Sequence, residues 1–291
     1  MNQNPPASAD KTKTEQLLES SKPQGQRSLL MPLFLMGMLL AAVYLLRGGN
    51  PLLEGLIPVV FAGSIVVAVL HTARIARRQQ REKDAVRVID ESIRLGQWET
   101  ADAVTTQLLE KPVMLPQVRV QALIYLGAIL VRQGQYQQVL DLYDHLLGTM
   151  AFPPQIAVSL KCVRVYAMLR GEFLSDAYQA IVQLKREAPG GLAMLSLLEL
   201  YRLVKMGHPA DALELFGQSQ TQMAAQLGHR SCDGWALAAA AAMALGREQD
   251  AEGYARNAGL LGDVREIAKR FPECKAIVDR IWPAEAQVQP S

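Results

Sequence analysis

The sequence predicts an all-α protein in which an N-terminal transmembrane helical hairpin precedes an α-solenoid of about five helix-turn-helix units. Two long apolar runs near the N-terminus contain no Asp, Glu, Lys or Arg. Five short phrases that contain a glycine then recur at intervals of 38, 37, 36 and 39 residues. Between these phrases, apolar residues follow the three- and four-residue spacing of amphipathic helices.

Composition excludes several classes of protein. Half of the 291 residues are hydrophobic, and the formal net charge is only +2. The chain therefore lacks the strongly basic domain of a nucleic-acid-binding protein, and it is too apolar to be disordered throughout. The three cysteines are widely spaced and form no Cys-x-x-Cys pair, which favours a reducing compartment over a disulfide framework.

The N-terminal quarter is predicted to cross a membrane twice. Residues 1–27 are polar and are expected to be disordered. Residues 28–46 form the first predicted span, since an uncharged run of 18 residues makes a helix of about 27 Å, close to a hydrocarbon core of about 30 Å. Residues 47–54 form a short loop with a Gly-Gly-Asn-Pro turn, and residues 55–73 form the second span. A signal peptide is the alternative for the first run, but a long polar segment precedes it and a second apolar run follows.

The orientation follows from basic residues that flank the predicted hairpin. Beyond the second span lie Arg74, Arg77, Arg78, Arg81, Lys83 and Arg87. Four further Lys and Arg residues precede the first span, whereas the connecting loop contains Arg47 alone. The positive-inside rule then places both termini in the cytoplasm, with two spans in a bacterial-type inner membrane. The cluster after the second span could also contact anionic lipid headgroups, or it could serve only as a topology signal.

Residues 74–262 carry the repeats. The turn phrases are Leu-Gly-Gln-Trp at 95–98, Gln-Gly-Gln-Tyr at 133–136, Arg-Gly-Glu-Phe at 170–173, Met-Gly-His-Pro at 206–209 and Leu-Gly-Arg-Glu at 245–248. Each glycine is predicted to adopt the left-handed conformation that ends one helix before its antiparallel partner begins. Because residues 118–131 are apolar on nearly all sides, the hairpins are expected to stack. Residues 263–282 are predicted to form a capping helix, and residues 283–291 a disordered tail.

These phrases resemble a tetratricopeptide-repeat (TPR) array over about residues 80–260. The second unit carries the resemblance best, with Leu126-Gly127 in its first helix, Gly134 and Tyr136 at the turn, Tyr143 in the second helix and Pro153 after it. The small residue that the family places in the second helix is matched by Ala101, Ala212 and Ala251. In the second unit this position is Val139, and in the third the small residue is displaced to Ala177. A related helical solenoid with irregular hairpins is therefore the alternative to a TPR array.

The resemblance implies that a partner peptide or helix binds along the inner face, which the first helices of the hairpins form. The candidate groove residues are Gln121, Ile124, Ala128, Arg132, Val158, Lys161, Val165, Met168, Leu197, Tyr201 and Lys205. Lys161 matches one position of the family's carboxylate clamp, but Ala128 and Val165 stand where an amide is needed. An apolar helix or strand with some acidic character is therefore the expected guest. Alternatively, Ile124, Val165 and Leu197 belong to the core between repeats.

The sequence offers little for catalysis. The four histidines are isolated, and no phosphate-binding, zinc-protease or nucleophile-elbow motif occurs. Cys232 with His229 and Asp233 most resembles an enzyme's residues, yet Ser231 or Asp233 would also serve as an N-cap. The prediction is that the protein is not an enzyme and holds no metal or cofactor.

The predicted function is a membrane-anchored scaffold or adaptor. Its expected partners are an unidentified protein or peptide and the lipid bilayer, without nucleic acid, and a homo-oligomer is possible. One alternative is an accessory subunit of a membrane-associated enzyme or biosynthetic pathway, because the architecture is similar to that of membrane proteins associated with late heme biosynthesis. The other is a self-associating structural membrane protein.

Overall fold

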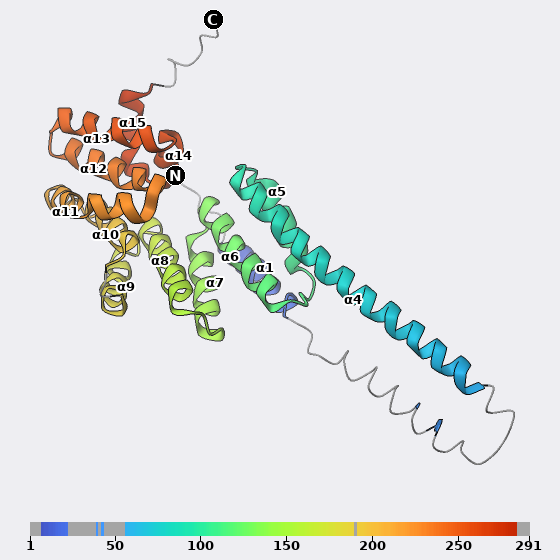
Figure 1. Cartoon of the computed structure of the whole chain (residues 1–291). Coiled ribbons are helices and arrows are strands. Elements are labelled where there is room, and N and C mark those ends of the chain that lie inside the picture. Colours follow the sequence, from blue (N-terminus) through green and yellow to red (C-terminus); the bar gives the residue numbers. More distant parts are fainter. Residues whose placement is uncertain (1–6, 23–38, 40–41, 44–55, 189–190, 284–291) are drawn as a thin grey trace, which may run out of the picture. The chain divides into compact units, whose positions relative to one another are not determined.

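The computed structural model describes residues 7–22, 39, 42–43, 56–188 and 191–283. These residues form helices and no strands, which confirms the predicted all-α class (Figure 1). The chain divides into two compact units, residues 1–138 and 139–291, which are described separately below.

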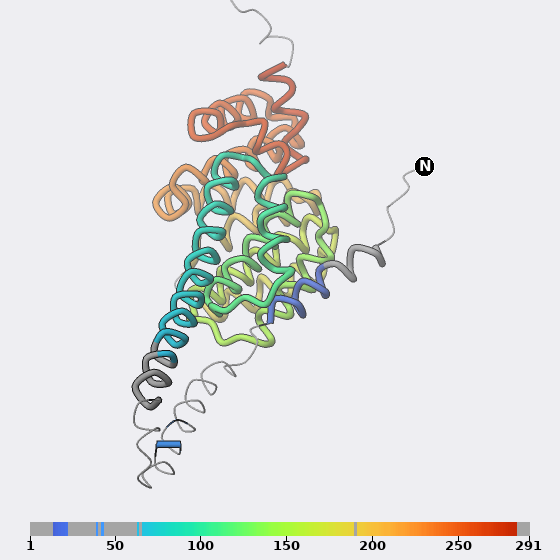
Figure 2. The backbone as a smooth tube through the Cα atoms, turned by 90° about the vertical axis from the view of Figure 1, so that its right-hand side faces the viewer, coloured from blue at the N-terminus to red at the C-terminus, as the bar shows by residue number. Residues whose placement is uncertain are grey.

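The first unit is built around one long helix. Its elements are α1 (Ala7–Ser20), α4 (Leu56–Arg94), α5 (Trp98–Leu109), α6 (Pro116–Arg132) and the first turn of α7 (Tyr136–Thr149). The C-terminal half of α4 packs against α5 and α6, and Ile89 is completely buried there. The N-terminal half of α4 extends beyond the other helices of the unit in both views (Figures 1 and 2).

Helix α1 shows that the prediction of disorder for residues 1–27 is wrong for residues 7–22. Leu17 and Leu18 are buried, and α1 packs against α5. From α6, Arg119 donates hydrogen bonds to the Ser21 hydroxyl and to the Leu18 carbonyl, both at 3.0 Å. The segment has too few apolar residues to fold alone, but α5 and α6 supply the partners from about 100 residues away. Residues 1–6 and 23–27 lie outside the described residues.

The predicted membrane hairpin falls largely outside the described residues. This holds for the first span, 28–46, apart from residues 39, 42 and 43, and for the loop, 47–54. The second span, 55–73, coincides from Leu56 onward with the N-terminal half of α4. Within the part of the chain that the structure describes, no helix combines the length and the apolar character needed to cross a membrane.

The second unit consists of stacked helical hairpins. It contains most of α7, the hairpins α8 (Pro154–Arg170) with α9 (Leu174–Glu187), α10 (Ala193–Lys205) with α11 (Pro209–Leu227) and α12 (Cys232–Ala244) with α13 (Glu248–Leu261), and the short 3₁₀ helix η1 (Gly228–Ser231). Helix α10 contacts both α8 and α12, so the first helices of successive hairpins lie side by side. Helix α12 is rich in buried alanines because neighbours cover it on several sides.

The predicted capping helix at 263–282 is broken into three pieces. They are α14 (Val264–Arg270), the 3₁₀ helix η2 (Pro272–Cys274) and α15 (Lys275–Ile281), of which α15 packs against α12 and α13. The single helix is wrong because Pro272 lacks a backbone N–H and disfavours a helical conformation at the preceding residue. Phe271 accordingly has φ −127° and ψ 85°. Of the predicted tail, residues 284–291 lie outside the description.

Four of the five predicted left-handed turns are confirmed. Positive φ angles between 72° and 76° occur at Gly96, Gly134, Gly207 and Gly246. In the third hairpin the left-handed residue is Glu172, with φ 66°, whereas Gly171 has φ −84°. A Cβ atom at residue 171 would lie 2.7 Å from the Phe173 ring, so a larger residue there would have to displace that side chain. The third turn is therefore shifted by one residue from its predicted position.

Substitution of Gly207 by alanine is expected to lower the free energy of unfolding by about 1 kcal/mol. A Cβ atom at this residue would meet nothing within 4 Å, so the whole cost comes from its φ of +73°. Gly217→Ala in the exposed middle of α11 is the matched control, and we expect it to raise the free energy of unfolding by about 0.5–1 kcal/mol. Urea denaturation of the full chain measures both; a change of the same sign in the two variants would contradict the assignment.

Candidate partner-binding groove

The predicted groove residues of the first unit all lie on helix α6, which is partly exposed. Gln121, Ile124, Ala128 and Arg132 all lie on α6 and are all half-buried. The Arg132 guanidinium lies over the Trp98 ring of α5, 5.5 Å from its centroid. This α6 face, defined by these four residues, combines apolar, amide and cationic groups.

In the second unit, most predicted groove residues belong to the core. Val158 and Lys161 of α8 are half-buried, and Lys161 donates a hydrogen bond of 2.6 Å to Glu187, which holds the pKa of that carboxyl below its ordinary value. The residues that the structure buries are Val165, Met168, Leu197 and Tyr201. Lys205 exposes only 7% of its side chain. The alternative that these apolar positions form core is therefore correct for Val165 and Leu197.

The C-terminal ends of α8 and α10, which form part of the inner face of the second unit, contact the chain's own C-terminal segment, defined as residues 264–282. The Tyr166 hydroxyl donates to the Arg270 carbonyl at 2.9 Å. Arg170 donates to the same carbonyl and to that of Lys269, the latter at 3.1 Å. The Lys205 ammonium lies 3.5 Å from the Glu273 carboxylate. These contacts join α8 and α10 to a segment up to 104 residues further along the chain.

An aromatic cluster lies at the centre of this contact. The Phe271 ring packs edge-on against Tyr201, with centroids 4.8 Å apart, and against Tyr166 at 5.9 Å. Tyr201 is completely buried and its hydroxyl approaches Glu273 at 3.5 Å. Burial, together with the nearby Glu273 carboxylate, raises the pKa of Tyr201 far above its usual value, so Tyr201 is a neutral hydroxyl at physiological pH.

A buried ion pair also joins the C-terminal segment to α12. The Arg270 guanidinium lies 2.5 Å from Asp233, which is completely buried in the first turn of α12. Burial lowers the pKa of Arg270, but the Asp233 carboxylate outweighs that effect and raises it overall. Asp233 thus binds the C-terminal segment and makes no N-capping bond, and the side chain of Ser231 makes none either.

The cysteines do not form a reactive site. All three thiols are free and buried. Burial raises the pKa of Cys162 and of Cys232 to about 11, and it raises the pKa of Cys274 as well. A thiol with such a pKa is protonated at neutral pH and is a poor nucleophile. Throughout the described ranges, no group of three or more His, Cys, Asp or Glu residues could hold a metal ion.

Of the residues that hold the segment, the sequence predicted Tyr201 and Lys205 as groove residues and gave Asp233 a different role. It did not indicate the contacts of Tyr166, Arg170, Arg270, Phe271 and Glu273. The shifted third turn explains part of this. Counted from Glu172, the position six residues before the turn is Tyr166, which is equivalent to Tyr201 before Gly207. Counted from Gly171, that position is Val165, as predicted. One sequence signal could have identified Arg170. A cation stands two residues before the left-handed residue in four hairpins, as Arg94, Arg132, Arg170 and Lys205.

The fold and this contact define an all-α protein of stacked helical hairpins in which the C-terminal segment packs against the ends of α8 and α10. Comparisons with protein-family models, with curated proteins and with solved structures find no match to this chain.

Proposed function

We propose that the protein is a membrane-anchored, TPR-like adaptor that mediates protein–protein interaction at the cytoplasmic face of a bacterial-type inner membrane. The observation that carries the anchor is a meeting of two segments in the first unit. The Val113 amide donates to the Ser21 carbonyl at 3.4 Å, and the adjacent Pro112 carbonyl accepts from Arg78 at 2.6 Å. Ser21 and Arg78, which lie on either side of the predicted hairpin, therefore both contact residues 112–113 of this unit.

This geometry supports a hairpin over a single crossing. If the intervening chain enters a bilayer, it must cross an even number of times to return to the unit that it left. The two uncharged runs in residues 28–46 and 55–73 supply two crossings of suitable length.

The surface of α4 supports the same proposal. The side chains of Val66, Val67, Val69 and Leu70 are each more than half exposed. Four large apolar residues within five positions are an unusual surface in water, but they suit a lipid environment. Basic residues begin four positions after this stretch, at Arg74, and all six that the sequence singles out lie exposed on α4. The positive-inside rule then favours a cytoplasmic repeat domain.

Partner recognition is proposed for the α6 face. On the inner face of the second unit, the C-terminal segment already contacts the ends of α8 and α10, and its release would expose Phe271, Cys274 and Ile277, which are all buried. The α6 face keeps half-exposed apolar positions, with Arg132 as a cationic contact. An apolar helix or strand with an acidic residue is the guest that this chemistry favours.

Cysteine accessibility in intact bacterial cells tests the anchor. The native thiols are buried with raised pKa values, so they contribute little background with a membrane-impermeant maleimide. Asn50→Cys should react in intact cells, whereas Lys22→Cys and Lys83→Cys should react only after permeabilisation. If Asn50→Cys also required permeabilisation, the hairpin would be excluded.

Site-specific photo-crosslinking tests the adaptor role. A photoreactive residue at position 124 on the α6 face should capture the same discrete partner repeatedly, and Arg132→Glu should weaken that capture. A photoreactive residue at exposed Gln218 of α11 is the control. Capture of only a second copy of this chain would favour self-association, and capture of a single membrane enzyme would favour an accessory subunit. Equal capture from positions 124 and 218 would contradict the α6 face.

A further inference from the structure

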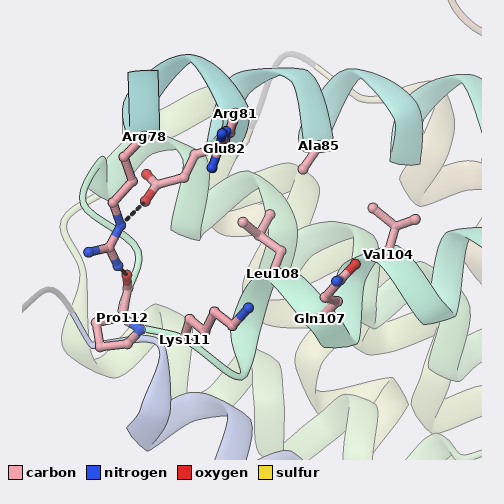
Figure 3. A pocket seen from close by; sticks show the side chains of 9 residues that line it. All are labelled: Arg78, Arg81, Glu82, Ala85, Val104, Gln107, Leu108, Lys111 and Pro112. Atoms are coloured by element: carbon pink, nitrogen blue, oxygen red, sulfur yellow. Dashed lines mark hydrogen bonds and ion pairs between the residues drawn. The ribbon is translucent and has the colours of Figure 1, made fainter. Parts of the chain in front are cut away.

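A pocket of about 620 Å³ lies in the first unit between α4 and α5, away from the α6 face. Its lining residues are Arg78, Arg81, Glu82, Ala85, Val104, Gln107, Leu108, Lys111 and Pro112. Figure 3 shows the Leu108 side chain pointing into the space between the two helices, with the Lys111 ammonium beside it. The pocket therefore combines an apolar wall with three cations and one carboxylate.

Two of these charges are used to build the pocket. Glu82 is buried and accepts hydrogen bonds from the Met114 and Leu115 amides at 3.0–3.2 Å, which satisfies backbone donors at the start of α6. Arg78 reaches from α4 to the Pro112 carbonyl at 2.6 Å and lies 3.6 Å from Glu82 (Figure 3). These contacts tie α4 to the loop after α5 and close one end of the pocket.

The other two cations are available to a ligand. Arg81 and Lys111 are both exposed, and neither forms a hydrogen bond or an ion pair with any residue whose placement is described. They approach the pocket from opposite walls, Arg81 from α4 and Lys111 from the loop just after α5. An anion between them would be bound by two charges without any loss of existing contacts.

The pocket lies just beyond the apolar half of α4. Arg78 and Arg81 follow Ala73, the last residue of the uncharged run, by five and eight residues. At 1.5 Å per residue these positions are about 8 and 12 Å along the helix axis. The headgroup layer extends about 5–8 Å beyond the hydrocarbon core. In a membrane-anchored chain, Arg78 therefore lies at the outer edge of the headgroup layer. Arg81 lies about 4 Å beyond it, and its long side chain can reach back to the headgroups.

We propose that this pocket binds the headgroup of an anionic glycerophospholipid, with the phosphate between Arg81 and Lys111. The carbon atoms of the headgroup, which lie on the side of the phosphate away from the bilayer, contact Val104 and Leu108. The apolar wall distinguishes this ligand from free phosphate, which gains nothing from such a surface. The site would fix the angle at which the first unit meets the membrane. It rests on the proposed membrane anchor, but the binding chemistry itself can be measured without a bilayer.

The experiment is native mass spectrometry of the full chain in a neutral detergent, titrated with dioctanoyl phosphatidylglycerol or dioctanoyl phosphatidylcholine. Phosphatidylglycerol should bind about tenfold more tightly. Loss of both free cations in Arg81→Gln/Lys111→Gln should weaken it by at least about tenfold, since each basic residue near the surface contributes about fivefold. The control, Lys83→Gln/Arg87→Gln, removes the same charge from exposed positions of α4 outside the pocket, and its effect should stay below twofold.

Two further measurements identify the ligand class. Inorganic phosphate, added as a competitor, should displace phosphatidylglycerol only at far higher concentration. Leu108→Gln should weaken phosphatidylglycerol binding and leave any binding of inorganic phosphate unchanged. Circular dichroism confirms that the variants remain folded.

Three results would overturn the proposal. Equal affinity for the two lipids would exclude headgroup recognition, and equal losses in the two double variants would indicate diffuse charge. Equally effective competition by inorganic phosphate would indicate a free-anion site. Because the titration uses detergent, it reports on the pocket even if the cysteine-accessibility test rejects the anchor.

Discussion

Replacement of Arg270 by alanine is expected to lower the free energy of unfolding by about 3 kcal/mol. The substitution leaves Asp233, which is completely buried, without its cation. Loss of one partner of a buried ion pair costs about 3–5 kcal/mol, and we take the lower value because the Arg270 side chain is itself 37% exposed. Chemical denaturation of the full chain measures the change.

The neighbouring residue supplies the control for Arg270. Lys269 forms an ion pair with Glu266 at 2.6 Å on the surface, so Lys269→Ala should cost about 0.5 kcal/mol or less. Cys274 adds a local readout, because it is completely buried within the same segment. Its thiol should become reactive to a maleimide in Arg270→Ala under native conditions and stay protected in Lys269→Ala. Equal stability of the two variants would show that the Asp233 pair does not hold the segment.

Replacement of Tyr201 by alanine is expected to lower the free energy of unfolding by about 3–5 kcal/mol. Its ring has no exposed surface, and it contacts Phe271 from the C-terminal segment and Tyr166 from α8. Alanine would leave a cavity among three helical elements and remove the aromatic pairs. The midpoint of urea denaturation should fall without a change in its slope.

Two variants separate the ring of Tyr201 from its hydroxyl and from aromatic residues in general. Tyr201→Phe keeps the ring and removes only the 3.5 Å contact with Glu273, so its cost should be about 1 kcal/mol or less. Tyr178→Ala removes an exposed ring that stacks with Arg202 at 4.9 Å, and about 1 kcal/mol or less is again expected. If Tyr201→Phe proved as costly as Tyr201→Ala, the hydroxyl and not the ring would stabilise the contact.

Local features of the structure were predictable from the sequence. The stripe after Gly134 illustrates this, because Val139, Leu140, Leu142, Tyr143 and Leu146 are all buried on one side of α7. Helical spacing places such residues together whatever the rest of the chain does. The four left-handed glycines were predictable for the same reason, since the missing Cβ makes glycine the natural residue at such a turn.

The candidate site was less predictable because its contacts join distant segments. Nothing local to Arg270 indicates Asp233 as its partner 37 residues earlier in the chain, and nothing local to Tyr166 indicates the carbonyl of Arg270. The shift of the third turn to Glu172 changed the register of α8 by one residue. On a helix of 3.6 residues per turn this rotates a position by about 100°, which exchanges buried Val165 for the contact residue Tyr166.

The sequence by itself therefore determined the helical class, four of the five hairpin turns and the two apolar runs, because helix periodicity, glycine turns and uncharged stretches are properties of neighbouring residues. The tertiary structure decided that residues 7–20 form a packed helix, that the C-terminal segment contacts the ends of α8 and α10, and that Arg81 and Lys111 line one pocket. Each of these outcomes depends on a partner that is remote in the sequence. Burial of Arg119, Asp233 and Tyr201 is favourable only once that partner supplies hydrogen bonds or apolar contact, and no local pattern specifies where it lies.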